Sequence, residues 1–389
     1  MPSISSILSA NIEGIIDDYT THAGVLSKLA PTLREHLEET KKILPFPQGS
    51  LDGKSLVAID GGRLKEDMAG GDLMVIGATA GEGHSSQPTY NEETIPAEAY
   101  AVVLPHRVAN EKLAGGIMSA FELRMLELAT ADVQIIDGAY VNNVSQVLFL
   151  LLDNDDETID AFFKAIDYDK DELLRTSMRK VMYPPRDYSR TLIALPKSDT
   201  ARIYSQELIH DDYAQHVISD RILASRMLLP GEMFLPRNIA SNNVLITRLE
   251  KGNFRTYNGE HKALYKDMFS MMLEYFRRMN HENTEEGILW TTYFKPNVGT
   301  PQSKAMKIEF PYYPVAGKEH GGVVEHAQKL ISMVDADMID GFVIEPWCQY
   351  MADVRAKDVS AAKEIIKNYL ISTTEDSYDL AGLLRNYRT

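Results

Sequence analysis

Hydrophobic and polar positions change their periodicity along the chain, and these changes predict its elements. Short apolar runs rich in β-branched residues and bounded by glycine or acidic residues predict strands over 56–60, 73–78, 100–104 and 133–137. Between the last two strands, apolar residues recur at helical spacing over 112–129, which predicts an amphipathic helix. A further short apolar run over 192–195 predicts a fifth strand. The order is three strands, a helix, and then two more strands.

A helix between the third and fourth strands can act as a crossover, which brings the fourth strand back to the sheet beside the first and parallel to it. Asp60 at the end of the first strand and Asp137 at the end of the fourth then lie at similar depth. The crossover helix covers the sheet, so Glu122 on that helix can point towards both. We therefore predict an α/β fold, an RNase H-like mixed five-stranded sheet flanked by helices, with N-terminal helices and a largely helical insertion.

The remaining segments are assigned in the same way. Residues 1–45 read as helical, and we divide the chain into an N-terminal helical segment, 1–50, and an RNase H-like domain, 51–389, with an insertion over about 144–300. Helical spacing predicts helices over 144–152, 158–165, 170–181, 214–228, 264–278, 323–334 and 350–370. Additional strands are predicted over 244–249, 290–295, 307–310 and 342–344.

Composition narrows the class of protein. The chain has 389 residues, of which 44% are hydrophobic and 25% charged, as expected of a globular protein with a large core. It has no apolar run of the roughly 18 residues that a membrane span requires, and no basic leader before an apolar core. Its single cysteine, Cys348, excludes an internal disulfide. We expect a cytoplasmic protein without a membrane partner.

The net charge of −16 argues against a protein that binds nucleic acid over its whole surface. It does not exclude a nuclease, because carboxylates of a metal site add to the negative charge and basic residues can be confined to one groove.

Three acidic residues carry the candidate chemistry. Asp60 and Asp137 each end an apolar run and precede glycine, although Asp-Gly is also a common turn. Glu122 borders the apolar stripe of its helix, where Glu111 and Glu127 are the competing positions. Converging carboxylates repel one another and favour a divalent cation, and oxygen ligands favour Mg²⁺ or Mn²⁺. The pattern indicates metal-assisted phosphoryl chemistry.

Two more residues are candidates for the same site. Lys197 follows the 192–195 strand, where it could contact a scissile phosphate or orient a water, or be an ordinary exposed lysine. Asp353 lies in the first turn of the last predicted helix, where the helix dipole favours an acid in any case. A fourth acid is also what a two-metal site would use.

In the order and spacing of these motifs, the chain resembles the NurA nuclease family over about residues 50–365. The motifs are Val57-Ala-Ile-Asp60-Gly-Gly62, the helix with Glu122, Ile135-Ile-Asp137-Gly-Ala-Tyr140, Leu195-Pro-Lys197-Ser198 and the segment from Gly341 to Asp353. The resemblance implies an RNase H-like Mn²⁺- or Mg²⁺-dependent DNA nuclease with 5′-to-3′ exonuclease and single-strand endonuclease activities. It also implies a homodimer that docks on a hexameric HerA-type translocase in end resection or phage defence.

By the same resemblance, Asp60, Glu122, Asp137 and Asp353 would be metal ligands. Some members carry histidine at the position of Asp353 and tyrosine at that of Phe342. The dimer would use the N-terminal helices or the helical segment near 144–180.

We therefore expect two-metal phosphodiester hydrolysis, in which Asp60 bridges both ions, Glu122 and Asp137 hold one, and Asp353 holds the other. Lys197 would neutralise charge that develops on the phosphate. One alternative is a catalytically inactive dimeric clamp that serves as an adaptor of the translocase. A sugar kinase or actin-like ATPase would share the early topology, but the sequence lacks the duplicated halves with glycine-rich phosphate loops that this class needs.

Overall fold

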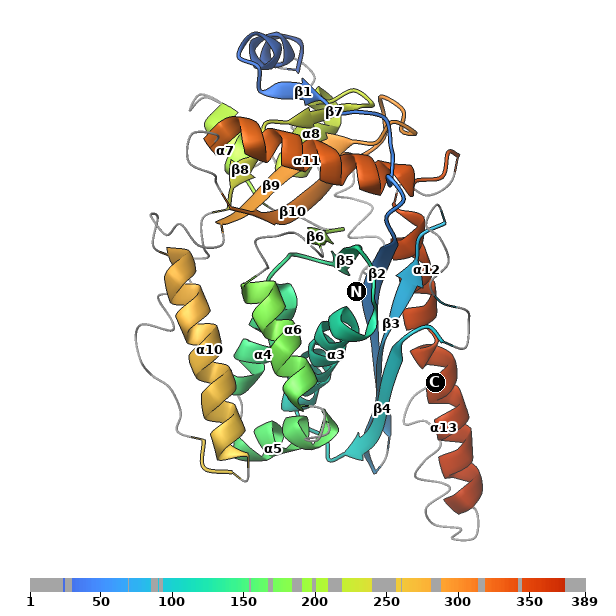
Figure 1. Ribbon diagram of the computed structural model, residues 1–389. Helices are drawn as coiled ribbons and strands as arrows, with labels where there is room; N and C mark the ends of the chain where they lie inside the picture. The colour runs from blue at the N-terminus through green and yellow to red at the C-terminus, as the bar shows by residue number, and fades with distance from the viewer. Residues whose placement is uncertain are drawn as a thin grey trace, which may run out of the picture.

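The computed structural model describes residues 24, 30–68, 70–84, 90, 94–153, 155–166, 171–183, 191–197, 201–208, 219–239, 257–259, 261–280, 288–313, 319–341 and 345–374. A ten-stranded mixed sheet runs through the molecule in the order β1-β7-β9-β10-β6-β5-β2-β3-β4, with β8 paired to β9 (Figure 1). Among the described helices, none is both long and apolar enough to cross a bilayer.

Half of this sheet is the predicted five-stranded unit. Its strands are β2 (Leu56–Met68), β3 (Gly71–Glu82), β4 (Ala97–Leu104), β5 (Val133–Asp137) and β6 (Thr191–Leu195). β2, β3 and β4 form an antiparallel meander, and β5 pairs in parallel with both β2 and β6. The prediction that the first and fourth strands lie side by side and parallel is confirmed. β2 and β3 are much longer than the apolar runs that predicted them.

Helices cover both faces of this unit. The crossover helix α3 (Ala109–Leu128) packs on the face that carries Val57 and Ile59, and further helices extend this layer. They are α4 (Asn142–Asp153), α5 (Asp156–Ala165), α6 (Asp171–Met182) and α10 (Lys262–Asn280), all close to their predicted positions. The opposite face, with Ala58 and Ile135, packs against α11 (Glu319–Ala336) and α12 (Trp347–Ala356). The site described below lies between these two helical layers.

The sheet continues beyond the five predicted strands. β10 (Met306–Tyr312) pairs antiparallel with β6, and β9 (Ile288–Lys295) follows it. The outer strands are β7 (Glu232–Phe234), β8 (Arg237–Asn238) and β1 (Ile43–Pro45). The short helices α7 (Ile203–Leu208) and α8 (Asp220–Met227) pack beside them. The insertion over 144–300 is therefore helical only in part, because it also supplies β6, β7, β8 and β9.

Two predicted helices are wrong in extent. The N-terminal helix was predicted to reach residue 45, but residues 30–39 are helical and β1 follows. Lys41 adopts a left-handed conformation with φ of 53°, which ends the helix and turns the chain into the sheet.

The predicted terminal helix over 350–370 is two helices, α12 and α13 (Val359–Thr374). Lys357 and Asp358 separate them, and the Asp358 carbonyl oxygen accepts from the Ala362 amide 3.0 Å away as the second helix starts. The break lets α12 lie over the part of β2 and β3 away from their hairpin turn, while α13 packs near that turn at Met68 and Leu73 (Figure 1).

The predicted strands over 244–249 and 342–344, the start of the predicted helix at 214, and most of the N-terminal segment lie outside the described residues. The division of the chain at residue 50 stays a prediction.

Candidate active site

The site lies where β5 ends and β2 continues. β5 pairs with β2 from Leu56 to Ile59 and stops at Asp137, whereas β2 runs on to Met68. In the described part of the chain, no strand pairs with the β5-facing edge of β2 beyond Ile59. Asp60 is the first residue of the unpaired stretch, and Asp137 is the last residue of β5. Ile59 is paired with Ile136, so Asp60 and Asp137 are the next residues on the two neighbouring strands.

Two glycines after Asp60 let helices approach β2 from both faces. A Cβ atom at Gly61 would lie 2.6 Å from Glu122 Oε1 on α3, and a Cβ atom at Gly62 would lie 2.1 Å from the Ala356 carbonyl oxygen of α12. Because side chains alternate along a strand, Asp60 faces α12 like Gly62. Glu122 reaches β2 from the other layer. Gly61 therefore lets the Glu122 carboxylate approach the edge where Asp60 lies, and Gly62 lets α12 approach from the other face.

Lys197 lies at the centre of the site, two residues after β6. Its Nζ is 3.2 Å from Asp137 Oδ2, 3.7 Å from Glu345 Oε2 and 3.9 Å from Asp353 Oδ1. The structure thus brings Asp137, Lys197 and Asp353 together, as the sequence analysis expected. Glu345 belongs to the same group, but the sequence analysis did not single it out. The signal that could have found it was its place eight residues before Asp353, directly before Pro346 and α12.

Gln349 is the second residue that the sequence analysis missed. It is buried on α12, and its Nε2 donates to Asp137 Oδ1 at 2.8 Å and to the Leu195 carbonyl oxygen at 3.3 Å. Gln349 precedes Asp353 by four residues, which is one helical turn. The i, i+4 spacing of Gln349 and Asp353 was the available signal. Asp353, predicted in the first turn of the last helix, lies in the second turn of α12.

Burial raises the pKa values of Asp60 and Glu122, the two most buried acids of the site. Asp60 is 8% exposed, and burial together with the nearby Asp137 carboxylate raises its pKa to about 7, although Lys197 and the Gly61 amide act in the opposite direction. Burial also raises the pKa of Glu122 well above its usual value, and the charges of Asp60 and Asp137 add to the effect. The carboxyl groups of the site therefore outnumber the positive charges that could balance them.

The pKa values of Lys197 and Glu345, which are more exposed, reflect the same excess of carboxyl groups. Burial lowers the pKa of Lys197, but the Asp137 and Asp60 carboxylates outweigh it, so that the pKa is raised overall. Burial raises the pKa of Glu345, against the attraction of Lys197.

The donor set fits a hard divalent cation. Asp60, Asp137, Glu345 and Asp353 surround Lys197, and the Glu122 carboxyl group lies next to Asp60 and Asp137. Oxygen ligands of this kind suit Mg²⁺ and Mn²⁺. The carboxylates are spread around the ammonium group, and within the described residues no three of them bring ligand atoms within 4.8 Å of one another. The ammonium groups of Lys197 and Lys357 are the nearest positive charges to these carboxylates, and both pair with Asp353.

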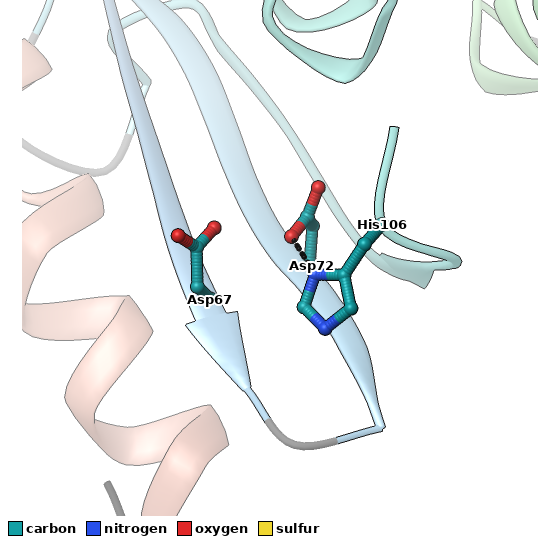
Figure 2. A group of neighbouring side chains, drawn as sticks. All are labelled: Asp67, Asp72 and His106. Carbon is teal, nitrogen blue, oxygen red and sulfur yellow. Dashed lines mark hydrogen bonds and ion pairs between the residues drawn. The ribbon is translucent and has the colours of Figure 1, made fainter. Parts of the chain in front are cut away.

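A tighter acidic group lies elsewhere. Figure 2 shows Asp67 near the end of β2, Asp72 at the start of β3 and His106 just after β4, with ligand atoms within 4.8 Å of one another. His106 Nδ1 lies 2.6 Å from Asp72 Oδ1, and Asn110 Nδ2 donates to Asp72 Oδ2 at 2.7 Å. Lys65 Nζ lies 2.8 Å from Asp67 Oδ1 and 3.4 Å from Asp72 Oδ2.

These side chains supply each other's partners and already include a cation, so we assign the group to anchoring the β2–β3 hairpin. Asp67 is seven residues from Asp60, about 23 Å along the strand. The group is therefore separate from the site around Lys197.

Comparisons with known proteins bear on the fold. No protein-family model matches the chain, and no curated protein sequence matches it. Among solved structures, the NurA nuclease from Sulfolobus solfataricus superimposes with a TM-score of 0.54 at 11% identity, over 93% of this chain and 97% of that one.

Two further NurA structures are similar with lower scores. One has a TM-score of 0.46 at 9% identity, over 89% of this chain and 94% of that one. The other, bound to dAMP and manganese, has a TM-score of 0.43 at 11% identity, over 90% and 93%. The strand order, the crossover helix and the extent of the match to the Sulfolobus solfataricus enzyme lead to one conclusion about architecture: this protein has a NurA-like fold.

Proposed function

We propose that the protein is a metal-dependent nuclease that hydrolyses phosphodiester bonds in DNA. The observation that carries the proposal is the convergence of four segments on Lys197. The end of β5, the segment just before α12 and the second turn of α12 place Asp137, Glu345 and Asp353 within 4 Å of the ammonium group of Lys197, which follows β6, and the buried Asp60 lies nearby. A NurA-like fold with carboxylates at this edge supports a nuclease over other hydrolases.

We assign the metal ligands to Asp60, Glu122, Asp137 and Asp353, for two Mn²⁺ or Mg²⁺ ions. Asp60 interacts electrostatically with Glu122, Asp137 and Asp353, so it is suited to bridge both ions. Glu122 and Asp137 would hold one ion and Asp353 the other. Bound ions would supply an activated water and charge stabilisation for the leaving oxygen.

The exposure of the side chains suits this division of roles. Glu122 and Asp60 are 5% and 8% exposed, so they suit ligands of a buried cation and not contacts to the DNA backbone. The side chains of Asp353 and Lys197 are 27% and 40% exposed, so a DNA backbone can reach them. Lys197 would donate to a non-bridging phosphate oxygen and neutralise charge as the bond breaks.

The finer assignments rest on the resemblance in motif order. They are 5′-to-3′ exonuclease and single-strand endonuclease activities, a homodimer, and action with a hexameric HerA-type translocase in DNA end resection or antiviral defence. The second candidate, a catalytically inactive dimeric clamp for such a translocase, is disfavoured because the acids and Lys197 are together in one site.

The test is cleavage of end-labelled linear single- and double-stranded DNA in Mn²⁺, in Mg²⁺ and in EDTA. The wild type is compared with Asp60→Ala and with Asp67→Ala, a control on the same strand whose side chain is 72% exposed. We expect metal-dependent cutting that Asp60→Ala abolishes and Asp67→Ala retains. If Asp60→Ala cuts at the wild-type rate, the site is wrongly assigned.

Failure of the wild type to cut in either metal, with and without a HerA-type translocase, would leave the clamp as the explanation. Sedimentation of the same sample tests the homodimer.

A further inference from the structure

We propose that Gln349 is a positioning residue that orients the Asp137 carboxylate, so that one of its oxygens is directed at the bound cation. This inference rests on the proposed function, because it concerns the metal ligands of that site.

The two oxygens of Asp137 have different surroundings. Gln349 Nε2 donates to Oδ1 at 2.8 Å, while Oδ2 faces the Lys197 ammonium at 3.2 Å. Gln349 is 1% exposed, so water does not compete for this hydrogen bond. The amide therefore engages one oxygen and leaves the other directed to the positive charge. A ligand held in this way loses less rotational freedom when a cation binds.

The same amide joins three elements. Besides Asp137 at the end of β5, Gln349 Nε2 donates to the carbonyl oxygen of Leu195, which is the register partner of Asp137 on β6. Its own backbone belongs to α12, one turn before Asp353. Gln349 thus sets the position of α12 against the two strand ends, and with it the separation of Asp353 from Asp137.

A neutral donor is the suitable group at this position. Glutamate at 349 would place a further negative charge beside Asp137. Lysine would add a cation that competes with the metal. An apolar residue would leave Asp137 Oδ1 and the Leu195 carbonyl oxygen without this buried donor, and both would lose hydrogen-bond energy. The amide satisfies both acceptors and adds no charge.

The test is Mn²⁺ affinity, measured by titration calorimetry on the full chain without DNA. Gln349→Met removes the amide and keeps the length of the side chain. Gln134→Met is the matched control, because Gln134 is a buried glutamine on β5 whose Nε2 donates to the carbonyl oxygens of Leu126 and Ala129, away from the site. Both variants lose a buried donor, but only one loses contact with a proposed ligand.

We expect Gln349→Met to weaken Mn²⁺ binding about 10- to 100-fold, a range typical of residues that orient metal ligands, and Gln134→Met to bind as the wild type does. Excess Mn²⁺ should then restore DNA cleavage by Gln349→Met. Gln349→Asn keeps the amide but is one methylene shorter. It should also bind Mn²⁺ more weakly, and it serves as the test if the methionine variant does not fold.

Wild-type affinity in a folded Gln349 variant overturns the inference and leaves the proposed nuclease intact. Equal losses in Gln349→Met and Gln134→Met also overturn it, because the effect would then be a general one of stability. If the wild type itself binds no Mn²⁺, the proposed function fails.

Discussion

Asp137 is the last residue of β5, Lys197 follows the end of the neighbouring parallel strand β6, and the Lys197 ammonium lies 3.2 Å from Asp137 Oδ2. The pairing of Asp137 with Leu195 sets this distance, since Lys197 is two residues beyond its strand. One lysine is thereby placed among three carboxylates that come from different segments. Its charge compensates Asp137 and Glu345, while Asp353 also pairs with the more exposed Lys357.

Replacing Lys197 by methionine should therefore destabilise the metal-free protein. The side chain is 40% exposed, so we expect a loss of only about 1 kcal/mol in the free energy of unfolding at pH 8, well below that of a fully buried ion pair. DNA cleavage should fall about 100-fold, because a charge that faces the phosphate is lost. Chemical denaturation and cleavage rates measure the two effects.

Lys357→Met is the matched control for this substitution. Lys357 Nζ also pairs with Asp353, at 2.6 Å, but its side chain is 70% exposed. We expect unchanged stability and cleavage in this variant. Equal effects of the two lysine substitutions would contradict the central place given to Lys197.

Asp60→Asn should stabilise the metal-free protein while it abolishes cleavage. The pKa of Asp60 is about 7 in the folded state against 3.8 ordinarily, so the folded state holds the proton more tightly. The stabilising contribution of the protonated acid is fully present below pH 4 and is lost as pH rises through 7. Asparagine resembles the protonated acid, so thermal melts in EDTA should show a higher Tm than the wild type at pH 8 and little difference at pH 4. A lower Tm at pH 8 would show that Asp60 is not under electrostatic strain.

Mn²⁺ binding should strengthen as pH rises from 6 to 8. A protonated carboxyl group is a poor ligand, and Asp60, with its pKa of about 7, must lose its proton when the ion binds. The raised pKa of Glu122 acts in the same direction. Affinity should change by about tenfold per pH unit below 7 for each proton released. Calorimetric titrations in buffers of different ionisation enthalpy count the protons, and affinity that is constant over this range would contradict the assignment of these two acids.

The glycines after Asp60 should respond differently to the same substitution. Alanine at 61 would bring its Cβ 2.6 Å from Glu122 Oε1, so it should displace that carboxylate and weaken Mn²⁺ binding about tenfold or more. Alanine at 62 would collide with the backbone of α12 at Ala356, so it should lower the Tm instead. Gly70→Ala, in the turn of the same hairpin, meets no atom within 4 Å and should change neither property. A Gly61→Ala variant with wild-type Mn²⁺ affinity would remove Glu122 from the ligand set.

The five-stranded unit could be predicted because its apolar runs and its crossover helix are local signals. The further strands could not be joined to it from the sequence. β1, for example, is three residues long and pairs with β7, which is nearly 190 residues away. The break between α12 and α13 was missed because apolar positions continue at helical spacing through Asp358, and the hairpin to which α13 docks was not visible at that stage.

Part of the site was predictable for a similar reason. Asp60 and Asp137 end recognisable strands, so topology alone places them together. Gln349 carries no charge, and its importance comes from contacts with Asp137 and Leu195, which are more than 150 residues away in the sequence. Glu345 lies outside the helices and strands, so neither helical nor strand periodicity could predict where its side chain points.

The length of β2 has a consequence for hydrogen exchange. β2 is hydrogen-bonded to β3 from Val57 to Met68 and flanked by β5 at its start, with helices on both faces. Amide protons in the part of β2 that is paired on both sides, up to Ile59, should exchange only when the whole domain opens. Asp60 directly follows this part, so the proposed metal site adjoins a strongly protected segment. Lys197 follows the end of its strand and lies where local opening is easier, so the two sides of the site should differ in exchange protection.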